Sequence, residues 1–488
     1  MLERHFLTLA IACLSLVGRM LAAPQAPPPP PAREFRAAWV ATVNNIDWPS
    51  RPGLPAAAAR AELAAIVERA AALGLNALVF QVRPCGDAFY RSDLEPWSEW
   101  LTGAQGRAPD EAWDPLQFVV DRCHARGLQL HAWFNPYRAR HPSSKTPEAP
   151  SHVLRRQPDA CVTFGSYRWM DPGDPRSAAW TLAVIRDVVR RYDIDGVHLD
   201  DYFYPYPEKK AVFADDASWT RYRRGGGRLG RDDWRRQCID QFVADLYAMV
   251  HREKPWLLVG ISPFGIARPG VPKGIAAGID QYAQLYADVP RWLAEGWVDY
   301  LAPQLYWPID QTAQSFPILL AWWRTQNPRQ RHLWPGVDAG RIVQGKPPSR
   351  PDELRDQIEL TRRGEDAPGH VLYSFRALRS NDPRGAGALA GRIYLEPAVA
   401  PASPWLGGAA PPTPVIRLEH ANPPVVHWNQ PGDARFVAVQ VHDGTRWRGY
   451  AVAGAAAGAI DLPAGTRAVA VTAIGRTGLA SGAAIERP

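Results

Sequence analysis

An apolar segment that suits a β-strand alternates with a segment that suits a helix along most of the chain. This repeat constrains the fold more than any other feature, because each strand-like segment is short and runs into polar residues. Eight such segments cover residues 37–43, 76–82, 128–134, 195–201, 256–261, 298–301, 333–337 and 371–375. Eight strands with helices between them predict an α/β fold, a (β/α)8 TIM barrel, over residues 33–400.

The intervening segments carry helix signals. Apolar residues recur at helical spacing from Leu63 to Ala70, and Asp-Pro pairs at Asp114 and Asp174 supply an N-cap followed by a proline. Helices are predicted over 55–72, from 114, from 174, and over 233–252, 282–295, 316–324 and 351–362, the last capped by Ser349. A doubly wound sheet is the alternative, but no glycine-rich phosphate loop follows the first strand.

The composition changes after Tyr394. Prolines recur between Pro397 and Pro414 and predict a linker over residues 401–411. Short alternating segments follow it, and Asp443-Gly444 is a hairpin signal between two of them. Residues 412–488 are therefore predicted to form a small all-β sandwich of the fibronectin III or immunoglobulin-like kind, as an accessory domain.

The first 23 residues have the layout of a secretory signal peptide, with an apolar run from Phe6 to Val17 and small residues up to Ala23. This run is shorter than the ~20 residues that span a bilayer. Cleavage near Ala23 would leave a proline-rich tether over 24–32, in a protein exported to the periplasm or the outer membrane. Contact with a membrane is expected only if Cys13 carries a lipid.

The bulk composition limits the classes of partner. The formal net charge is +7, but no Lys/Arg run of the kind that binds nucleic acid is present, so no nucleic-acid partner is expected. The cysteines after the predicted signal form no CxxC pair, and no metal or cofactor is predicted. Buried free thiols are expected for them, and one disulfide is the alternative.

The segment from Asp193 to Pro207 carries the strongest chemical signal. Val197 and Leu199 are expected on one face of a strand, with His198 and Asp200 on the other. The strand then ends in Asp200-Asp201 and a cluster of tyrosines. In a parallel barrel, the residues that follow the strands meet at one rim, where active sites lie. Asp195, at the start of the strand, is expected to have a structural role.

The polar and aromatic residues that follow the other strands are expected to line the same rim. The predicted substrate-binding residues are Asp47, Trp48, Arg83, Asp87, His131, Trp133, Asn135, Tyr137, His198, Tyr202, Ser262, Gln304, Tyr306, Trp307 and Asp338. Carboxylates, amides and flat aromatic rings together suit a sugar. Each residue has a structural alternative: a loop-forming aspartate, a histidine hydrogen-bonded in the core, or a tryptophan that packs.

Glycoside cleavage needs a protonated acid at the leaving oxygen and a second carboxylate. Asp200 and Asp201 are the predicted catalytic pair, because they lie at the strand end. A metal-dependent hydrolase is the competing hypothesis, with His131, His198 and Asp200 as ligands. Against it, no His-x-His occurs on the first strand and no ligand-type residue follows the fifth.

Several segments in this order resemble the bacterial glycosyl hydrolase-like 10 family. They cover residues 38–49, 80–88, 96–103, 131–138, 195–207, 260–265 and 303–307. The resemblance implies a barrel glycosidase of the cell envelope, since at least one member cuts peptidoglycan glycan strands that lack stem peptides. Asp200 and Asp201 match the family's Asp-Asp-Tyr-Phe-Tyr-Pro motif. The chain departs from the family after Gly265, where a Trp and an Arg-Asn pair are expected, so a substrate subsite is predicted to differ.

The function predicted from the sequence is therefore hydrolysis of an envelope polysaccharide, with denuded peptidoglycan glycan as the substrate. A non-catalytic glycan-binding or scaffold protein is the second hypothesis, because no other carboxylate is as prominent as the Asp200/Asp201 pair.

Overall fold

The computed structural model describes residues 26–110, 113–347, 350–364, 366–429 and 431–487. Residues 31–488 form one compact unit. The predicted signal peptide, the lipid site at Cys13 and the helix cap at Ser349 lie outside the described residues. No helix within the described ranges has both the length and the apolar character needed to cross a membrane.

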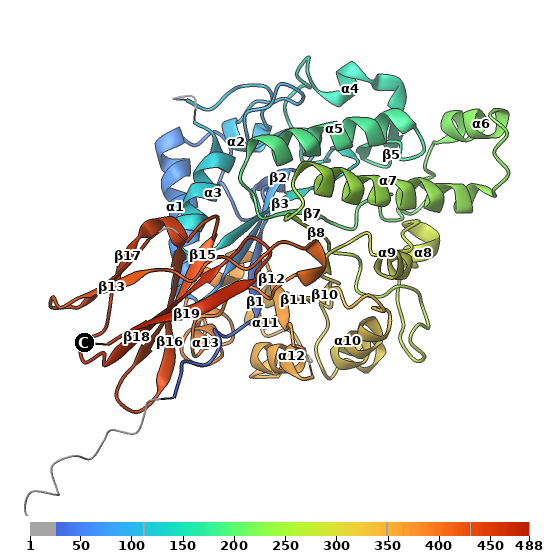
Figure 1. Ribbon diagram of the computed structural model, residues 1–488. Coiled ribbons are helices and arrows are strands. Elements are labelled where there is room, and N and C mark those ends of the chain that lie inside the picture. Colours follow the sequence, from blue (N-terminus) through green and yellow to red (C-terminus); the bar gives the residue numbers. More distant parts are fainter. Residues whose placement is uncertain (1–25, 111–112, 348–349, 365, 430, 488) are drawn as a thin grey trace, which may run out of the picture. The chain divides into compact units, whose positions relative to one another are not determined.

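Among the described residues, nine strands form one sheet in the order β10-β9-β8-β7-β3-β2-β1-β12-β11, and all of its pairs are parallel (Figure 1). The strands are β1 (Phe35–Val40), β2 (Ala77–Arg83), β3 (Gln129–Phe134), β7 (Gly196–Leu199), β8 (Leu258–Ile261), β9 (Tyr300–Leu301), β10 (His332–Leu333), β11 (Gly336–Asp338) and β12 (Gly369–Tyr373). Each of the eight predicted segments overlaps at least one of them.

The seventh predicted strand is divided into β10 and β11 because Pro335 has no N–H for the ladder. Hydrogen bonds nevertheless run through the gap. Trp334 N donates to Leu301 O at 2.9 Å, and Val371 N donates to Pro335 O at 3.0 Å. Gly336 N donates to Pro303 O at 2.8 Å. The ladder thus passes from β9 through β10 and β11 to β12, and the strands form a closed ring.

Helices surround this ring (Figure 1). The longer ones are α1 (Ala56–Ala72), α3 (Pro115–Ala125), α5 (Pro175–Arg191), α6 (Asp216–Arg224), α7 (Arg231–Glu253), α10 (Phe316–Thr325) and α12 (Glu353–Arg362). Shorter ones are α2 (Glu99–Thr102), α4 (Val153–Arg156), α8 (Gln281–Gln284), α9 (Val289–Glu295), α11 (Ala339–Val343) and α13 (Ala386–Leu389). The prediction of one helix over 282–295 is wrong. The structure has two helices there, α8 and α9, and the chain between them contains Tyr286, which has φ +54°.

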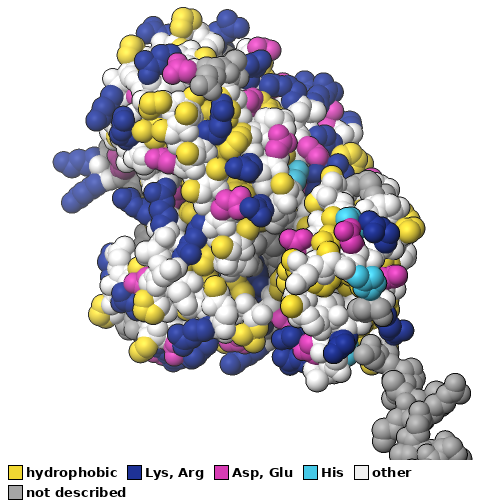
Figure 2. All heavy atoms as spheres, turned by 90° about the vertical axis from the view of Figure 1, so that its left-hand side faces the viewer, with side chains coloured by type: hydrophobic (Ala, Val, Ile, Leu, Met, Phe, Trp, Pro, Cys, Tyr) yellow, Lys and Arg dark blue, Asp and Glu magenta, His cyan; other side chains and the backbone are white. Residues whose placement is uncertain are grey.

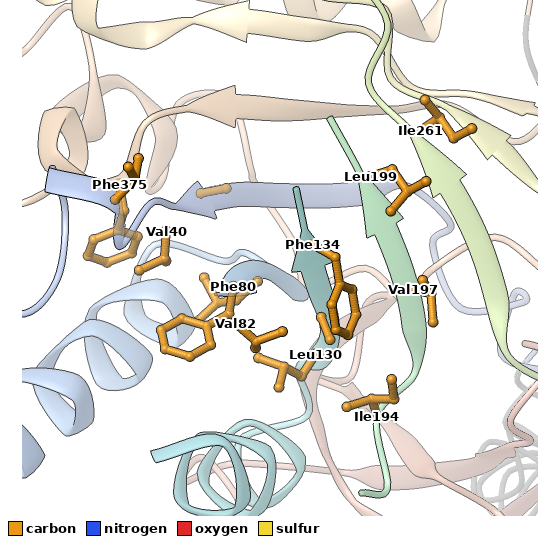
Figure 3. Packing of buried hydrophobic residues seen from close by; sticks show 14 of the residues in the cluster. Val40, Phe80, Val82, Leu130, Phe134, Ile194, Val197, Leu199, Ile261 and Phe375 are labelled. Carbon is orange, nitrogen blue, oxygen red and sulfur yellow. The ribbon is translucent and has the colours of Figure 1, made fainter. Parts of the chain in front are cut away.

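The outward-facing side chains of the strands pack against the helices. Val197 and Leu199 of β7 belong to this layer with Leu130 and Phe134 of β3 (Figure 3). His198 and Asp200 face the inside of the ring, where His198 contacts Tyr300. The alternation predicted for this strand is confirmed.

The inside of the ring contains a chain of neutral hydrogen bonds. Trp39 Nε1–H is only a donor, so His198 Nε2 accepts it at 3.2 Å and His198 Nδ1 carries the proton. That proton is donated to Tyr300 Oη at 2.9 Å, and the Tyr300 hydroxyl donates to His131 Nδ1, also at 2.9 Å. Burial lowers the pKa of His131 to about 4 and that of His198 well below its usual value. Both rings are therefore neutral at pH 7.

Glycines make room for these rings. A Cβ on Gly260 of β8 would lie 1.9 Å from the Tyr300 ring, and one on Gly196 of β7 would lie 2.6 Å from the His131 ring. The two positions tolerate only glycine as long as the aromatic rings stay in place.

Replacing Tyr300 by Phe is expected to lower the free energy of unfolding by about 1–3 kcal/mol, because His198 and His131 each lose a buried partner. Urea denaturation followed by circular dichroism measures the change. Tyr450→Phe, at a half-buried tyrosine of the C-terminal region, is the control. Equal losses in the two variants would contradict the proposed chain of hydrogen bonds.

A small antiparallel sheet, in the order β4-β6-β5, follows β3 and was absent from the predicted elements. It consists of β4 (Arg138–Arg140), β5 (Cys161–Phe164) and β6 (Tyr167–Met170). Trp169 of β6 is buried, and its Nε1 donates to Phe203 O at 2.9 Å. The inserted sheet therefore supports the loop that follows β7.

The C-terminal region forms two antiparallel sheets, in the orders β13-β14-β17 and β16-β15-β18-β19. Their strands are β13 (Ile416–Glu419), β14 (Val425–Trp428), β15 (Phe436–His442), β16 (Trp447–Gly454), β17 (Ala459–Asp461), β18 (Ala468–Ile474) and β19 (Ala480–Glu486). Val426 and Trp428 of one sheet share a buried cluster with Val439 and Val471 of the other. The two sheets therefore pack face to face.

The segment that joins the barrel to the sandwich crosses the N-terminal ends of the barrel strands. Ala400 and Leu406 pack against the cluster inside the ring. Ser403 Oγ lies 2.9 Å from His332 Nε2, and Trp405 Nε1 donates to Asp299 at 2.8 Å. These residues cover the base of the barrel.

The sandwich is fixed to the same end of the barrel by charge. Arg435 donates two hydrogen bonds of 2.7 Å to Asp193, and Arg476 donates a third to it. Asp195 accepts from Leu130 N and lies 2.8 Å from His124 Nε2 and 3.2 Å from Arg435 Nε. Asp195 thus has structural contacts only, as expected for an acid at the base of a barrel strand.

On the face shown in Figure 2, Lys and Arg side chains are spread among acidic and neutral ones and form no continuous stripe. The four cysteines in the described part of the chain are free thiols. Burial raises the pKa of Cys85 to about 12, so it is an unreactive thiol at pH 7.

Candidate active site

Asp200 follows the last residue of β7 and is 3% exposed. Its carboxylate accepts from Trp133 Nε1 at 3.1 Å and from Asn135 Nδ2 at 3.1 and 3.2 Å. Burial raises the pKa of Asp200, while the positive charge of Arg138 and these hydrogen bonds oppose the rise. Three groups thus favour the charged form of this buried carboxylate.

Asp201 is also 3% exposed but has a different environment. The Tyr206 hydroxyl donates a short hydrogen bond to its Oδ2. Burial, followed by the negative charge of Asp200, raises the pKa of Asp201 to about 7, against the hydrogen bonds from Tyr206 and Gln304. A carboxyl group with this pKa is still partly protonated at neutral pH, which suits a general acid.

Half-buried aromatic rings lie next to this pair. Tyr206 contacts Tyr202 edge-on, with ring centroids 5.2 Å apart, and lies 6.4 Å from Phe264. Phe264 in turn lies 5.7 Å from Trp307. The four rings come from the loops after β7, β8 and β9 and form a row that starts at Asp201. Sugar rings pack their C–H faces on such surfaces.

A second group of residues completes the rim on the side of β11 and β12. Tyr306 stacks on Tyr373 with centroids 5.5 Å apart. Asp338, at the end of β11, is half-buried and accepts from Arg341 N at 2.8 Å. Burial raises the pKa of Tyr373 to about 12, and the negative charges of Asp47, Asp338 and Asp201 add to the rise. The Tyr373 hydroxyl is therefore neutral at pH 7.

The structure thus brings several predicted site residues together at the rim. They are Trp133, Asn135, Asp200, Asp201, Tyr202, Gln304, Tyr306, Trp307 and Asp338. Trp133 and Asn135 hold a carboxylate in place, and the half-exposed members of the group are available to a ligand.

Four other predicted residues lie beneath the rim and stabilise its loops. Asp47 accepts from Ala41 N, Ser374 Oγ and Arg376 N, and Trp48 is fully buried with its Nε1 bound to Ala59 O. The Arg83 guanidinium is fully buried and forms a bidentate ion pair with Glu95, at 2.5 and 2.7 Å. Asp87, 1% exposed, accepts from Cys85 N.

Four more lie in the barrel interior or in the outer layer. His131 and His198 belong to the hydrogen-bond chain through Tyr300, and Ser262 lies 3.0 Å from His198 Nε2. Tyr137 is fully buried and packs on Phe242. The two histidines and Ser262 find hydrogen-bond partners inside the fold, whereas the buried Tyr137 hydroxyl has none among the described residues. All four side chains are buried.

The residues of the metal hypothesis do not converge. The nitrogens of His131 and His198 meet Tyr300, Gln129, Trp39 and Ser262, whereas Asp200 bonds to Trp133 and Asn135. In the described ranges, no group of three His, Cys, Asp or Glu side chains is placed to hold a metal ion.

Three rim residues were missing from the predicted site, namely Tyr206, Phe264 and Tyr373. The Tyr-Pro-Tyr-Pro sequence directly after Asp201 is a signal for Tyr206, since it continues the strand-end cluster. Phe264 lies three residues beyond the end of β8, and Tyr373 is the last residue of β12. In both cases an aromatic residue at a strand end was the available signal.

Comparisons with known proteins match the chain to glycosyl hydrolases. A family model described as Glycosyl hydrolase-like 10 matches residues 34–349. The chain is 38% identical to Glycosyl hydrolase YngK of Bacillus subtilis (strain 168) over 392 residues, which cover 79% of this chain and 76% of that protein. It is 32% identical to Glycosyl hydrolase DigH of Escherichia coli (strain K12), over 75% of this chain and 90% of that protein.

Among solved structures, the glycoside hydrolase domain of PgaB (BpsB) from Bordetella bronchiseptica is similar at 14% identity with a TM-score of 0.45. The match covers 74% of this chain and 99% of that one.

Proposed function

The chain belongs to the glycosyl hydrolase-like 10 family and is a glycoside hydrolase, and from this premise we propose that it cleaves glycan strands of the bacterial envelope. The proposed substrate is peptidoglycan glycan that has lost its stem peptides. The observation that carries the proposal is the pair of buried carboxyl groups at the end of β7, in two different electrostatic environments.

The two environments suggest a division of roles. Asp201, protonated below a pKa of about 7, donates its proton to the glycosidic oxygen as the bond to the anomeric carbon breaks. In its ionised form, Asp200 is held by Trp133 and Asn135 and faces the positive charge that develops on the sugar ring. Water then adds to the anomeric carbon, and its proton returns to the carboxylate of Asp201.

The glycan class is supported by the surroundings of the pair. The row of rings from Tyr202 to Trp307 offers flat apolar faces next to the proton donor, as a polysaccharide requires. The signal-like residues 1–23 support export to the periplasm or the outer membrane. Amino-terminal sequencing of the protein recovered from a periplasmic fraction tests this location.

The C-terminal sandwich is inferred to be of the fibronectin III or immunoglobulin-like type. A three-stranded and a four-stranded antiparallel sheet around one core support this assignment.

The decisive experiment is incubation of the purified protein with amidase-treated peptidoglycan, followed by mass spectrometry of the products. Shorter glycans are the expected result. Binding without cleavage would instead favour the glycan-binding or scaffold alternative. Cleavage that a chelator abolishes would favour the metal-dependent alternative.

The pH dependence of the reaction gives a further prediction. Because the acid must carry its proton, kcat/KM is expected to fall as the pH rises through about 7. The Tyr206 hydroxyl stabilises the ionised form of Asp201. Tyr206→Phe is therefore expected to raise the pKa of Asp201 and to move this alkaline limb to higher pH. Tyr450→Phe serves as the control, and a limb that moves to lower pH in Tyr206→Phe would contradict the assignment.

A further inference from the structure

A cavity of about 410 Å³ opens at the rim beside the active site, between the ends of β11 and β12. Asp338 and Tyr373 form the wall nearest to the barrel. Arg341 of α11, Lys346 and Arg376 also line it. Three cationic side chains therefore share the cavity with one carboxylate.

Asp338 is the one carboxylate that lines the cavity with these three cations, and the charges of Arg341 and Lys346 act on it. Among the described residues, none of the three cations forms an ion pair within 4 Å. Arg341 reaches only the neutral oxygens of Gln311 and Pro347, at 3.4 and 3.3 Å, and its Nε is buried without a hydrogen bond. The buried Arg83, by contrast, is neutralised by Glu95. The positive charge in the cavity is thus available to a ligand.

The cavity is connected to the catalytic pair through Tyr373. This tyrosine lines the cavity and stacks on Tyr306. Tyr306 directly precedes Trp307, the last ring of the aromatic row that starts at Asp201. A glycan bound along this row can therefore extend over the Tyr306–Tyr373 stack and place a neighbouring sugar at the cavity.

We propose that this cavity is a subsite for a sugar that carries a free carboxylate, with Arg341, Lys346 and Arg376 as its recognition residues. The inference rests on the proposed function and names the chemical group that the cavity recognises. In peptidoglycan, this group is the lactyl carboxylate of the muramic residue, which is an anion only when no peptide is attached. A strand with its stem peptides has a neutral amide at this position and loses the attraction.

The chemistry of the cavity fits this ligand. Arginine pairs with carboxylates through two parallel hydrogen bonds, and charged hydrogen bonds of this kind are stronger than neutral ones. Arg376 and Lys346 are exposed, so a sugar substituent can reach them from solvent. The backbone of Arg376 is fixed by its N–H bond of 2.7 Å to Asp47, which sets the direction of approach. A neutral sugar makes no use of these three charges.

Two glycans with the same backbone test the inference. One is amidase-treated peptidoglycan strands with free carboxylates, and the other is the same strands after carbodiimide coupling to methylamine. Binding is measured by calorimetry with Asp201→Asn, to prevent turnover, at low and high salt. The carboxylate form is expected to bind roughly tenfold or more tightly, the scale of one charged hydrogen bond, with a preference that decreases as salt is added.

The double variant Arg376→Gln/Lys346→Gln, in the same Asp201→Asn background, is expected to bring the ratio of the two affinities close to one. Arg392→Gln removes an exposed cation outside the cavity and is the matched control, expected to keep the ratio. Both substituted side chains are on the surface, and thermal unfolding by circular dichroism verifies that the variants fold. An equal affinity for both glycans, or a ratio unchanged in the double variant, overturns the inference.

Cleavage by the wild-type protein is measured in parallel on both glycans and separates the two proposals. Cleavage without any preference for the carboxylate form overturns the subsite and leaves the hydrolase. Charge-dependent binding without cleavage overturns the proposed reaction and leaves the subsite.

Discussion

Asp201→Asn is expected to reduce kcat by more than about 100-fold, the scale of removing a general acid. The amide cannot supply a proton, whereas it fits the space of the carboxyl group and keeps a partner in Tyr206. The fold and the affinity for the glycan are therefore expected to persist. Rates of glycan shortening, measured by mass spectrometry with substrate in excess, give the loss.

Asp461→Asn, at an exposed aspartate of the sandwich, is the matched control and is expected to retain the wild-type rate. Asp200→Asn should also be slow, because it replaces the anion that Trp133 and Asn135 hold. Near-normal rates in both Asp200→Asn and Asp201→Asn would move the catalytic groups elsewhere, with Asp338 as the next carboxylate of the rim to examine.

Glu95→Ala is expected to produce the largest loss of stability, about 3–5 kcal/mol. Both side chains of the Arg83–Glu95 pair are fully buried, so the variant leaves a guanidinium charge without its partner. Trp180 Nε1 also loses its acceptor, which lies at 2.8 Å. The midpoint of urea denaturation measures the effect.

The exposed pair Arg350–Asp310 provides the comparison. It has the same bidentate geometry, with bonds of 2.5 and 2.6 Å, but both side chains are more than 40% exposed. Asp310→Ala is therefore expected to shift the midpoint far less, because water replaces the lost partner. Similar shifts in the two variants would contradict the role of burial.

The barrel was predictable from the sequence because both sides of a buried parallel strand select apolar residues. Segments such as 76–82 and 128–134 stand out against the polar loops, and the structure has β2 and β3 there. The position of Asp200 and Asp201 followed from the same pattern, since a strand end in a parallel barrel is a rim position.

The role of the other polar residues was not predictable, because it depends on partners that are distant along the chain. Asp47 meets Ser374, Arg83 meets Glu95, and His131 of β3 meets Tyr300 of β9 inside the ring. Sequence shows a polar residue near a strand end but not whether another element already satisfies it. Partner identity therefore separates the stabilising residues from those that face the substrate.

Local sequence also failed where backbone geometry interrupts a regular pattern. The apolar periodicity between Tyr282 and Glu295 predicts one helix, but the left-handed backbone at Tyr286 and the proline at Pro290 divide it. The cationic cavity had no signal for a different reason. Arg341 and Lys346 belong to the segment after β11, whereas Arg376 follows β12, and the pairing of β11 with β12 brings the two segments together.

The covered base of the barrel links the stability of the two domains. Ala400 and Leu406 pack against the cluster that contains Phe35 and Trp334, and Arg435 holds the sandwich to Asp193. A chain cut after the last barrel strand would expose this cluster to water. The barrel is therefore expected to be unstable without the segment and the sandwich that follow it.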